Sequence, residues 1–204
     1  MPRVLLQNDQ WKRIIRHRRL TGADRFDEVW NGLYVTSPIA NNEHQTIATY
    51  LAVAFVEALG RQEGLIVQAA ANVSDQEADW TKNYRCPDVL VFLPGNTAED
   101  RKTHWYGGPD FAVEILSQSD RSRKKFGFYA RVGVRELLLV DRRPWRLELY
   151  RLNEGAYQLA GKSEIENPET LAASVLPLTF GLLPADPRPL LKVTRPADGR
   201  TWSV

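Results

Sequence analysis

Apolar residues recur at helical spacing in two segments of the N-terminal part of the chain. In the first segment they form one stripe within an otherwise basic stretch: Trp11, Ile14 and Ile15. In the second they follow three- and four-residue steps: Ile47, Ala48, Leu51, Ala54, Phe55 and Ala58. Such spacing predicts two amphipathic helices. The short helix is capped by Asn8 or Asp9 and ends before Gly22, and the long helix ends at Gly60.

Short apolar runs bounded by turn residues predict strands. Phe26–Trp30 and Leu33–Thr36 flank Asn31-Gly32, a pair that accepts the positive φ angles of a type I′ turn, so they predict a hairpin. Further strands are predicted at Leu65–Val73, Val89–Leu93, Phe111–Leu116, Arg135–Val140, Trp145–Leu152 and Tyr157–Ala160. The second and third of these runs are almost entirely apolar. We therefore expect them to lie centrally, in a sheet that is covered on both faces.

One more helix and two irregular segments complete the predicted organisation. Ser122–Val132 has a helical pattern and separates two predicted strands, which gives a strand–helix–strand unit. Pro94–Gly108 is rich in polar residues and glycine and predicts a surface loop. From Pro184 onward, four prolines interrupt every period, so we expect an irregular tail. The sequence thus predicts one α/β domain over residues 1–204, with a mixed central sheet flanked by helices.

The composition is that of a folded globular chain. Of the 204 residues, 43% are hydrophobic and 25% are charged, which argues against disordered, collagen-like and coiled-coil classes. A net charge of +2 allows a polyanionic partner without requiring one. Cys86 is the only cysteine, which excludes a disulfide framework and zinc sites built from cysteine pairs and favours a cytoplasmic location. We expect neither export nor a membrane anchor, because no segment has the required apolar length.

Two carboxylates stand at or within predicted apolar strands, where an ionised group loses its hydration. Asp88 opens the run Val89–Leu93, and Glu114 lies inside Phe111–Leu116. Burying such a charge costs on the order of several kcal/mol unless a cation compensates it. Because adjacent strands lie about 4.8 Å apart, carboxylates at matching heights can share one Mg²⁺ or Mn²⁺ ion. Structural hydrogen bonds are the alternative explanation.

Asp110 competes for the same role, because it also follows a proline, Pro109. It precedes Glu114 by four residues, which places it about 13 Å away along an extended strand. That distance is too large for one ion. We therefore interpret Asp88 as the partner of Glu114, and Asp110 as a residue that ends the preceding loop.

The order and spacing of several motifs resemble one group of nucleases. The motifs are Phe26–Gly32, Ser37-Pro38, His44, Pro87-Asp88-Val89, Pro109–Ser117, Lys125, Tyr129, Gly133-Val134 and Val140-Asp141. Together they cover most of the chain and resemble the PD-(D/E)XK nuclease superfamily, in particular its restriction-endonuclease-like group of bacterial proteins. The resemblance implies a restriction-endonuclease-like core in which Asp88 and Glu114 are metal ligands. It also implies a product with a 5′-phosphate and a homodimeric protein.

The chain departs from the wider superfamily at the lysine that completes the motif. Leu116 stands where that lysine would follow the glutamate, and in the resembling group the lysine comes from the next helix, which here carries Lys124 and Lys125. At 100° per residue, Lys125 lies about 90° from the centre of the inward helical stripe and Lys124 about 170°, so we expect Lys125 to reach the site. The segment Ser117–Lys124 is also shorter than in the group and lacks its usual acidic residue.

Glu28 and His44 match positions that lie near the site in the resembling group. Glu28 either binds a second ion or flanks the hairpin. His44 opens the long predicted helix on the side of its apolar stripe, where it suits contact with a metal-bound water or general-base work. A capping hydrogen bond at the start of the helix explains His44 equally well.

Other features also have a functional and a structural interpretation. The short basic helix is a candidate nucleic-acid contact through Lys12, Arg13, Arg16 and Arg19, although a solvated charged face explains it too. Cys86 is interpreted as a small buried hydrophobe and not as a nucleophile. Trp80 and Trp105 lie in predicted loops, where they suit base stacking or ordinary packing.

The predicted function is metal-dependent hydrolysis of phosphodiester bonds in nucleic acid, with DNA as the expected substrate. In this hypothesis Asp88 and Glu114 hold Mg²⁺ or Mn²⁺, and Lys125 orients or helps to deprotonate the attacking water. The alternative is a catalytically inactive nucleic-acid-binding or scaffold protein that retains the fold, because the short segment before Lys125 can misplace the lysine. Metal binding separates the two hypotheses.

Overall fold

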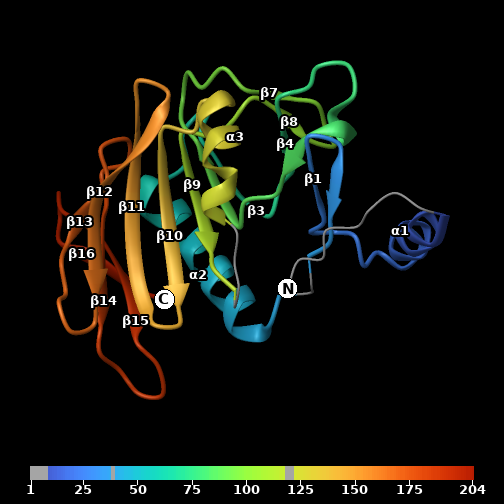
Figure 1. Cartoon of the computed structure of the whole chain (residues 1–204). Helices are drawn as coiled ribbons and strands as arrows, with labels where there is room; N and C mark the ends of the chain where they lie inside the picture. The colour runs from blue at the N-terminus through green and yellow to red at the C-terminus, as the bar shows by residue number, and fades with distance from the viewer. Residues whose placement is uncertain (1–8, 38–39, 118–121) are drawn as a thin grey trace.

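The computed structural model describes residues 9–37, 40–117 and 122–204 of the chain, and Figure 1 shows their arrangement. The helices are α1 (Asp9–Thr21), α2 (Asn42–Leu59) and α3 (Phe126–Arg131), with 3₁₀ turns η1 (Trp80–Lys82) and η2 (Ser122–Lys125). In the described part of the chain, no helix is long and apolar enough to cross a membrane. The expected capping residue Asn8 and the motif residue Pro38 lie outside the described residues.

The central sheet has six strands in the order β12-β11-β10-β9-β6-β3. Their bounds are β3 (Ile66–Ala69), β6 (Val89–Phe92), β9 (Phe111–Ile115), β10 (Glu136–Arg142), β11 (Trp145–Asn153) and β12 (Ala156–Glu164). Strands β9 and β10 are parallel and are joined through η2 and α3, whereas the other neighbours are antiparallel. The predicted mixed sheet and its strand–helix–strand unit are therefore confirmed, and β6 and β9 lie inside the sheet.

Two further sheets lie on opposite sides of the central one (Figure 1). The first has the order β2-β1-β5-β4-β8-β7 and consists of β1 (Glu28–Trp30), β2 (Leu33–Val35), β4 (Val73–Ser74), β5 (Tyr84–Arg85), β7 (Glu99–Asp100) and β8 (Trp105–Tyr106). The second has the order β13-β14-β15-β16 and consists of β13 (Leu171–Ala172), β14 (Thr179–Leu183), β15 (Leu190–Arg195) and β16 (Arg200–Ser203).

Alternating residues of the central strands supply two hydrophobic cores. Val89 and Val113 pack on one face with α2 and the β13–β16 sheet, in a cluster that contains Phe55 and Phe180. Leu90, Phe92, Ala112 and Leu137 pack on the other face with α3, together with Val73 and Trp105 of the β1-containing sheet. Both faces of the central sheet are covered, which explains the unbroken apolar runs of β6 and β9.

The predicted hairpin and long helix are confirmed. Strands β1 and β2 pair antiparallel around Asn31 and Gly32, whose φ angles are 50° and 82°. Asn41 caps α2 by accepting a hydrogen bond from the backbone N–H of His44, and Gly60 ends the helix with a φ of 72°. These local signals place Glu28 on the hairpin and His44 in the first turn of α2.

The structure corrects three predictions. The expected single strand Leu65–Val73 is two strands in different sheets, because the backbone turns at Ala70, whose φ is 56°. The predicted loop Pro94–Gly108 contains the short strands β7 and β8. The prediction of an irregular tail from Pro184 onward is wrong, since β15 and β16 pair there. The first three of the four prolines stand between β14 and β15 and the fourth stands between β15 and β16, so they remove no ladder hydrogen bond.

The segment Ser122–Val132 is helical, as predicted, but its first turn has a different geometry. It begins as the 3₁₀ turn η2 and continues as α3. Residues 118–121, which belong to the shortened segment before the lysine, lie outside the described residues.

Candidate active site

A cavity of about 640 Å³ opens where the β1–β2 hairpin, the first turn of α2, the ends of β6 and β9, and η2 meet. Its lining includes five residues for which the sequence predicts a role in catalysis: Glu28, His44, Asp88, Glu114 and Lys125. These residues come from five different elements or loops of the fold. The cavity is therefore the candidate active site.

Asp88 and Glu114 occupy facing positions on neighbouring strands. The register of β6 and β9 pairs Val89 with Val113, and continuing it by one residue sets Asp88 opposite Glu114. The backbone N–H of Asp88 donates to the carbonyl of Val113, and its Oδ2 accepts from the N–H of Ile115 at 2.7 Å. Facing residues of an antiparallel pair point to the same side of the sheet. The two carboxylates thus share one side of the sheet at one end of the two strands.

Among residues 9–37, 40–117 and 122–204, three side chains donate hydrogen bonds to the Glu114 carboxylate. Lys125 Nζ lies 3.0 Å from both Oε1 and Oε2. The phenol of Tyr129 donates to Oε1, and Ser122 Oγ donates to Oε2 at 3.2 Å. Burial, together with the charges of Glu114 and Glu28, raises the pKa of Tyr129 well above its usual value, so the phenol remains a proton donor.

Glu28 is held in place from two sides. Its Oε1 accepts from the backbone N–H of Cys86 at 2.9 Å, and its Oε2 accepts from Trp30 Nε1 at 2.6 Å. Lys125 Nζ also lies 2.9 Å from Glu28 Oε1. The side chains of Glu28 and Glu114 are only 4% and 5% exposed, so Lys125 bridges two buried carboxylates and balances part of their charge.

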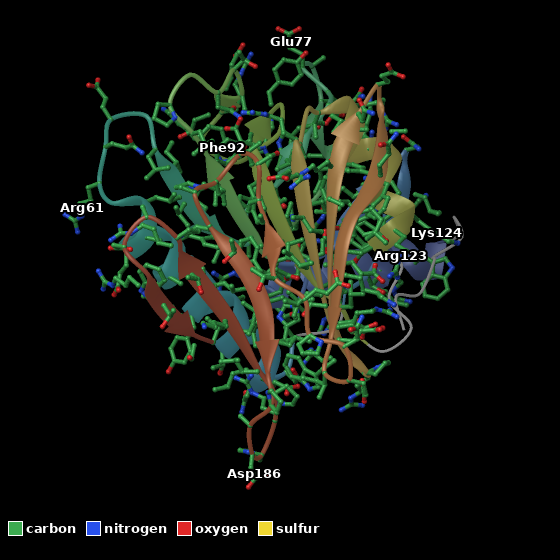
Figure 2. The ribbon with its side chains drawn as sticks, turned by 90° about the vertical axis from the view of Figure 1, so that its left-hand side faces the viewer. Arg61, Glu77, Phe92, Arg123, Lys124 and Asp186 are labelled. Atoms are coloured by element: carbon green, nitrogen blue, oxygen red, sulfur yellow. The ribbon has the colours of Figure 1, made fainter. Side chains whose placement is uncertain are left out.

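The structure places Lys125, and not Lys124, at the carboxylates. Lys124 is exposed and lies at the outer edge of the molecule in Figure 2. The spacing of 100° per residue in an α-helix also predicts that Lys125 faces the site. In the structure this segment is the 3₁₀ turn η2, whose residues are spaced by about 120°.

His44 contacts Asp88 as well as its own helix cap. Its Nε2 lies 3.2 Å from Asp88 Oδ2, while its Nδ1 is buried and has no hydrogen-bond partner among residues 9–37, 40–117 and 122–204. Burial alone would lower the pKa of His44, but the hydrogen bond and charge of Asp88 outweigh burial and raise it. The ring of His44 thus contacts the site, whereas the capping bond at the helix start joins the backbone N–H of His44 to the side chain of Asn41.

Arg142 ties the first turn of α2 to the end of the central sheet. It donates to Glu43 Oε2 at 2.8 Å, to Asn41 Oδ1 at 3.0 Å and to the carbonyl of Leu116 at 3.3 Å. These contacts connect β10, β9 and α2 beside the cavity. They fix the turn that carries His44 relative to the strand that carries Glu114.

Asp110 lies in a separate network at the opposite end of β9. Its carboxylate accepts from the N–H of Leu93, from Asn96 and from Arg135. It does not line the cavity. These bonds hold the ends of the 94–108 segment, which agrees with the interpretation of Asp110 as a loop-ending residue.

The predicted nucleic-acid contacts of α1 are not brought into the cavity. Lys12, Arg13, Arg16 and Arg19 are exposed, and α1 stands apart from the central sheet in Figure 1. A neighbouring arginine, Arg18, anchors the helix by a paired contact with Asp27 at 2.6 and 2.7 Å.

Two tryptophans and the cysteine have structural surroundings. Trp105 is buried and stacks on Phe92, whereas Trp80, which lies in η1, stacks on His104. Neither tryptophan lines the cavity, so the structure offers no support for base stacking at the site. Cys86 lines the cavity, but it is buried, and burial raises the pKa of its thiol.

The residues present fit a divalent ion held by two carboxylates. Within the described ranges, no group of three or more His, Cys, Asp or Glu side chains forms a complete metal cage. Mg²⁺ needs no such cage, because it keeps several waters and often binds through one or two carboxylates. The contacts of Asp88 all fall on Oδ2, so Oδ1 has no hydrogen-bond partner among those residues and is available as a ligand.

Sequence reasoning assigned no role to Tyr129, Ser122 or Trp30, although each contacts a site carboxylate. A signal for Tyr129 was present, because it follows Lys125 by four residues and so shares its helix face. A signal for Trp30 was also present, because it follows Glu28 by two residues on the same strand and so points to the same side. The bond of Ser122 depends on how η2 packs, and no spacing in the sequence indicates it.

Comparisons with known proteins agree with this architecture. The family model described as "Uma2: Putative restriction endonuclease" matches residues 16–185, whereas none of the curated proteins is a match. The crystal structure of a "putative nuclease belonging to DUF820" from Anabaena variabilis is similar, with a TM-score of 0.55 and 16% identity over 72% of this chain and 80% of that chain. The fold is thus that of restriction-endonuclease-like nucleases. The chain belongs to the Uma2 family of putative restriction endonucleases.

Proposed function

We propose that the protein is a metal-dependent endonuclease that hydrolyses phosphodiester bonds, with DNA as its substrate. One observation carries the proposal: the partly buried Lys125 donates a hydrogen bond to Glu114, and Asp88 faces Glu114 from the start of the adjacent strand, in one open cavity. Membership of a family described as "Putative restriction endonuclease" supports a nuclease function. The choice of DNA and of a metal ion rests on the chemistry of these residues and on the resemblance to PD-(D/E)XK nucleases.

In this proposal Asp88 and Glu114 hold Mg²⁺ or Mn²⁺. A bound ion of this kind supplies Lewis-acid activation of water and offsets negative charge on the phosphate. The Ile115 N–H fixes one oxygen of Asp88 and leaves the other for the ion. Tyr129 and Ser122 orient Glu114 from the side of α3 and η2.

Lys125 supplies a positive charge at the point where the reaction needs it. Its ammonium group orients the attacking water by hydrogen bonding and stabilises the charge that develops on the phosphate. Because its side chain is only 12% exposed, this charge acts in a medium that screens it weakly. His44 orients Asp88 through its Nε2 contact. Because its other ring nitrogen, Nδ1, is buried, general-base work by His44 would require the contact with Asp88 to open.

Cations around the cavity suit an anionic substrate. The exposed Arg143 and Arg123 both contribute to the lining, and α1 offers Lys12, Arg13, Arg16 and Arg19 as a second, sequence-independent contact. Phosphate contacts of this type position a nucleic acid without reading its bases. A cytoplasmic location and a homodimer complete the proposal.

The test is a cleavage assay on supercoiled plasmid with Mg²⁺, Mn²⁺ or EDTA. The wild type nicks the plasmid with either ion and not with EDTA, and Asp88→Asn abolishes nicking. Asp110→Asn is the matched control, because Asp110 also follows a proline but lies outside the cavity. Nucleic-acid binding without cleavage in any divalent ion would instead favour a catalytically inactive binding protein.

A further inference from the structure

Every acceptor site of the Glu114 carboxylate is already used by a protein donor. Oε1 accepts from Lys125 and Tyr129, and Oε2 accepts from Lys125 and Ser122. A carboxylate offers about four lone-pair sites in all. A divalent ion can therefore bind Glu114 only if one of these donors withdraws.

Lys125 is the donor that an incoming cation repels, because it is the charged one of the three. Tyr129 is fully buried on α3, and its phenol would lose a hydrogen bond in an apolar core. Lys125 carries the positive charge that an incoming cation replaces at Glu114. It also has a second carboxylate, Glu28, at 2.9 Å, which keeps its charge compensated after it leaves Glu114.

Glu28 is built as a fixed anchor for the lysine. The N–H of Cys86 and the indole of Trp30 each hold one of its oxygens, and its side chain is only 4% exposed. A carboxylate held in this way keeps its position when a neighbouring charge moves.

We infer that Glu28 is a positioning residue that retains Lys125 in the cavity when the lysine yields Glu114 to a divalent ion. This inference rests on the proposed function, because it takes Asp88 and Glu114 as the ligands. Glu28 then acts on the ion through Lys125 and is not itself a ligand. Without Glu28, the lysine binds Glu114 more tightly and competes more strongly with the ion.

A double-mutant cycle on Mn²⁺ binding, measured by calorimetry, tests this role without any activity assay. The four proteins are the wild type, Glu28→Gln, Lys125→Met and the double variant. Glu28→Gln removes one negative charge and therefore weakens Mn²⁺ binding whether residue 125 is lysine or methionine. Only the ratio of the two losses in affinity, with lysine and with methionine at position 125, reports on the lysine. We expect Glu28→Gln to weaken binding about tenfold more when Lys125 is present than when it is methionine.

Equal losses in the two backgrounds would make Glu28 a direct ligand or a distant charge, and would overturn the inference. A wild type that binds no Mn²⁺ would overturn the metal site and this inference together, whereas binding without coupling would overturn the inference alone. Glu136→Gln is the matched control, because Glu136 is a buried carboxylate that pairs with Arg151 at 2.7 Å outside the cavity, and Mn²⁺ affinity should not change.

A second measurement serves if Glu28→Gln does not fold. In crystals of the wild type with Mn²⁺, Lys125 Nζ should remain within about 3 Å of Glu28 and should have left at least one oxygen of Glu114. A lysine that keeps both oxygens of Glu114 and leaves Glu28 would overturn the inference.

Discussion

Lys125 Nζ lies 3.0 Å from each carboxylate oxygen of Glu114. The lysine comes from the last residue of η2, eleven positions after the glutamate. A strand residue two positions after Glu114 would be Leu116, which instead packs in the hydrophobic core beside α3. The fold thus brings a lysine to the carboxylate from the connection between two parallel strands, although the strand itself offers none.

The lysine itself gives the first prediction. Lys125→Met should reduce plasmid cleavage to background, because the charge that faces the reacting phosphate is lost. Lys124→Met should leave the rate unchanged, since Lys124 is exposed and points to solvent (Figure 2). Rates at saturating Mg²⁺ measure both effects. Equal losses for the two variants would show that η2 has another orientation in solution.

Tyr129 gives the second prediction. Tyr129→Phe removes only the hydroxyl that holds Glu114 and should lower the cleavage rate by about tenfold or more, as is typical for partners of a metal ligand. It should also lower the free energy of unfolding by about 1 kcal/mol. Tyr157→Phe is the control, because its hydroxyl donates to the carbonyl of Val134 at 2.6 Å and touches no site carboxylate. A comparable loss of rate in that control would mean that general destabilisation explains the effect.

The thiol of Cys86 gives the third prediction. Burial, with smaller contributions from the charges of Glu28 and Asp88, raises its pKa, so the fraction of reactive thiolate is suppressed at ordinary pH. Native protein at pH 8 should therefore react with a thiol reagent much more slowly than protein unfolded in urea, when both are followed by absorbance. Fast reaction of the native protein would return Cys86 to the list of candidate nucleophiles.

Helix α1 gives the fourth prediction. Alanine at Arg13, Arg16 and Arg19 should flatten the slope of log affinity against log salt by up to about 2 to 3 units on duplex DNA. Arg18 is left intact because it anchors the helix to Asp27. Affinity measured with Ca²⁺ separates binding from cleavage, and Arg61→Ala serves as a control at an exposed cation on another part of the surface (Figure 2). An unchanged slope would show that α1 is an ordinary solvated face.

Local patterns were sufficient to predict most of the elements around the site. The Asn31-Gly32 turn, the end of the long helix at Gly60 and the apolar run of β9 each depend on residues close together in the sequence, and each is confirmed. The pairing of β14, β15 and β16 is not apparent from the sequence, because closely spaced prolines interrupt the periodicity whether they stand inside strands or, as here, between them. The split at Ala70 was missed because an alanine gives no sign of a positive φ.

The site was only partly predictable for a similar reason. Carboxylates inside apolar strands are visible in the sequence, and so Asp88 and Glu114 were found. Lys125 contacts Glu114, which lies 11 positions earlier in the sequence, and Glu28, which lies 97 positions earlier. The contact with Glu28 depends on how the hairpin packs against η2. No period or spacing encodes that packing. The lysine's second partner therefore became apparent only in the folded structure.

The most direct test of the account is an anomalous difference map from crystals soaked with Mn²⁺. We expect one peak between Asp88 and Glu114, within about 2.0 to 2.6 Å of an oxygen of each carboxylate. The same crystals of Asp88→Asn should lose the peak, and those of Asp110→Asn should keep it. A peak bound by Glu28 instead, or no peak in the cavity at saturating Mn²⁺, would contradict the proposed metal site.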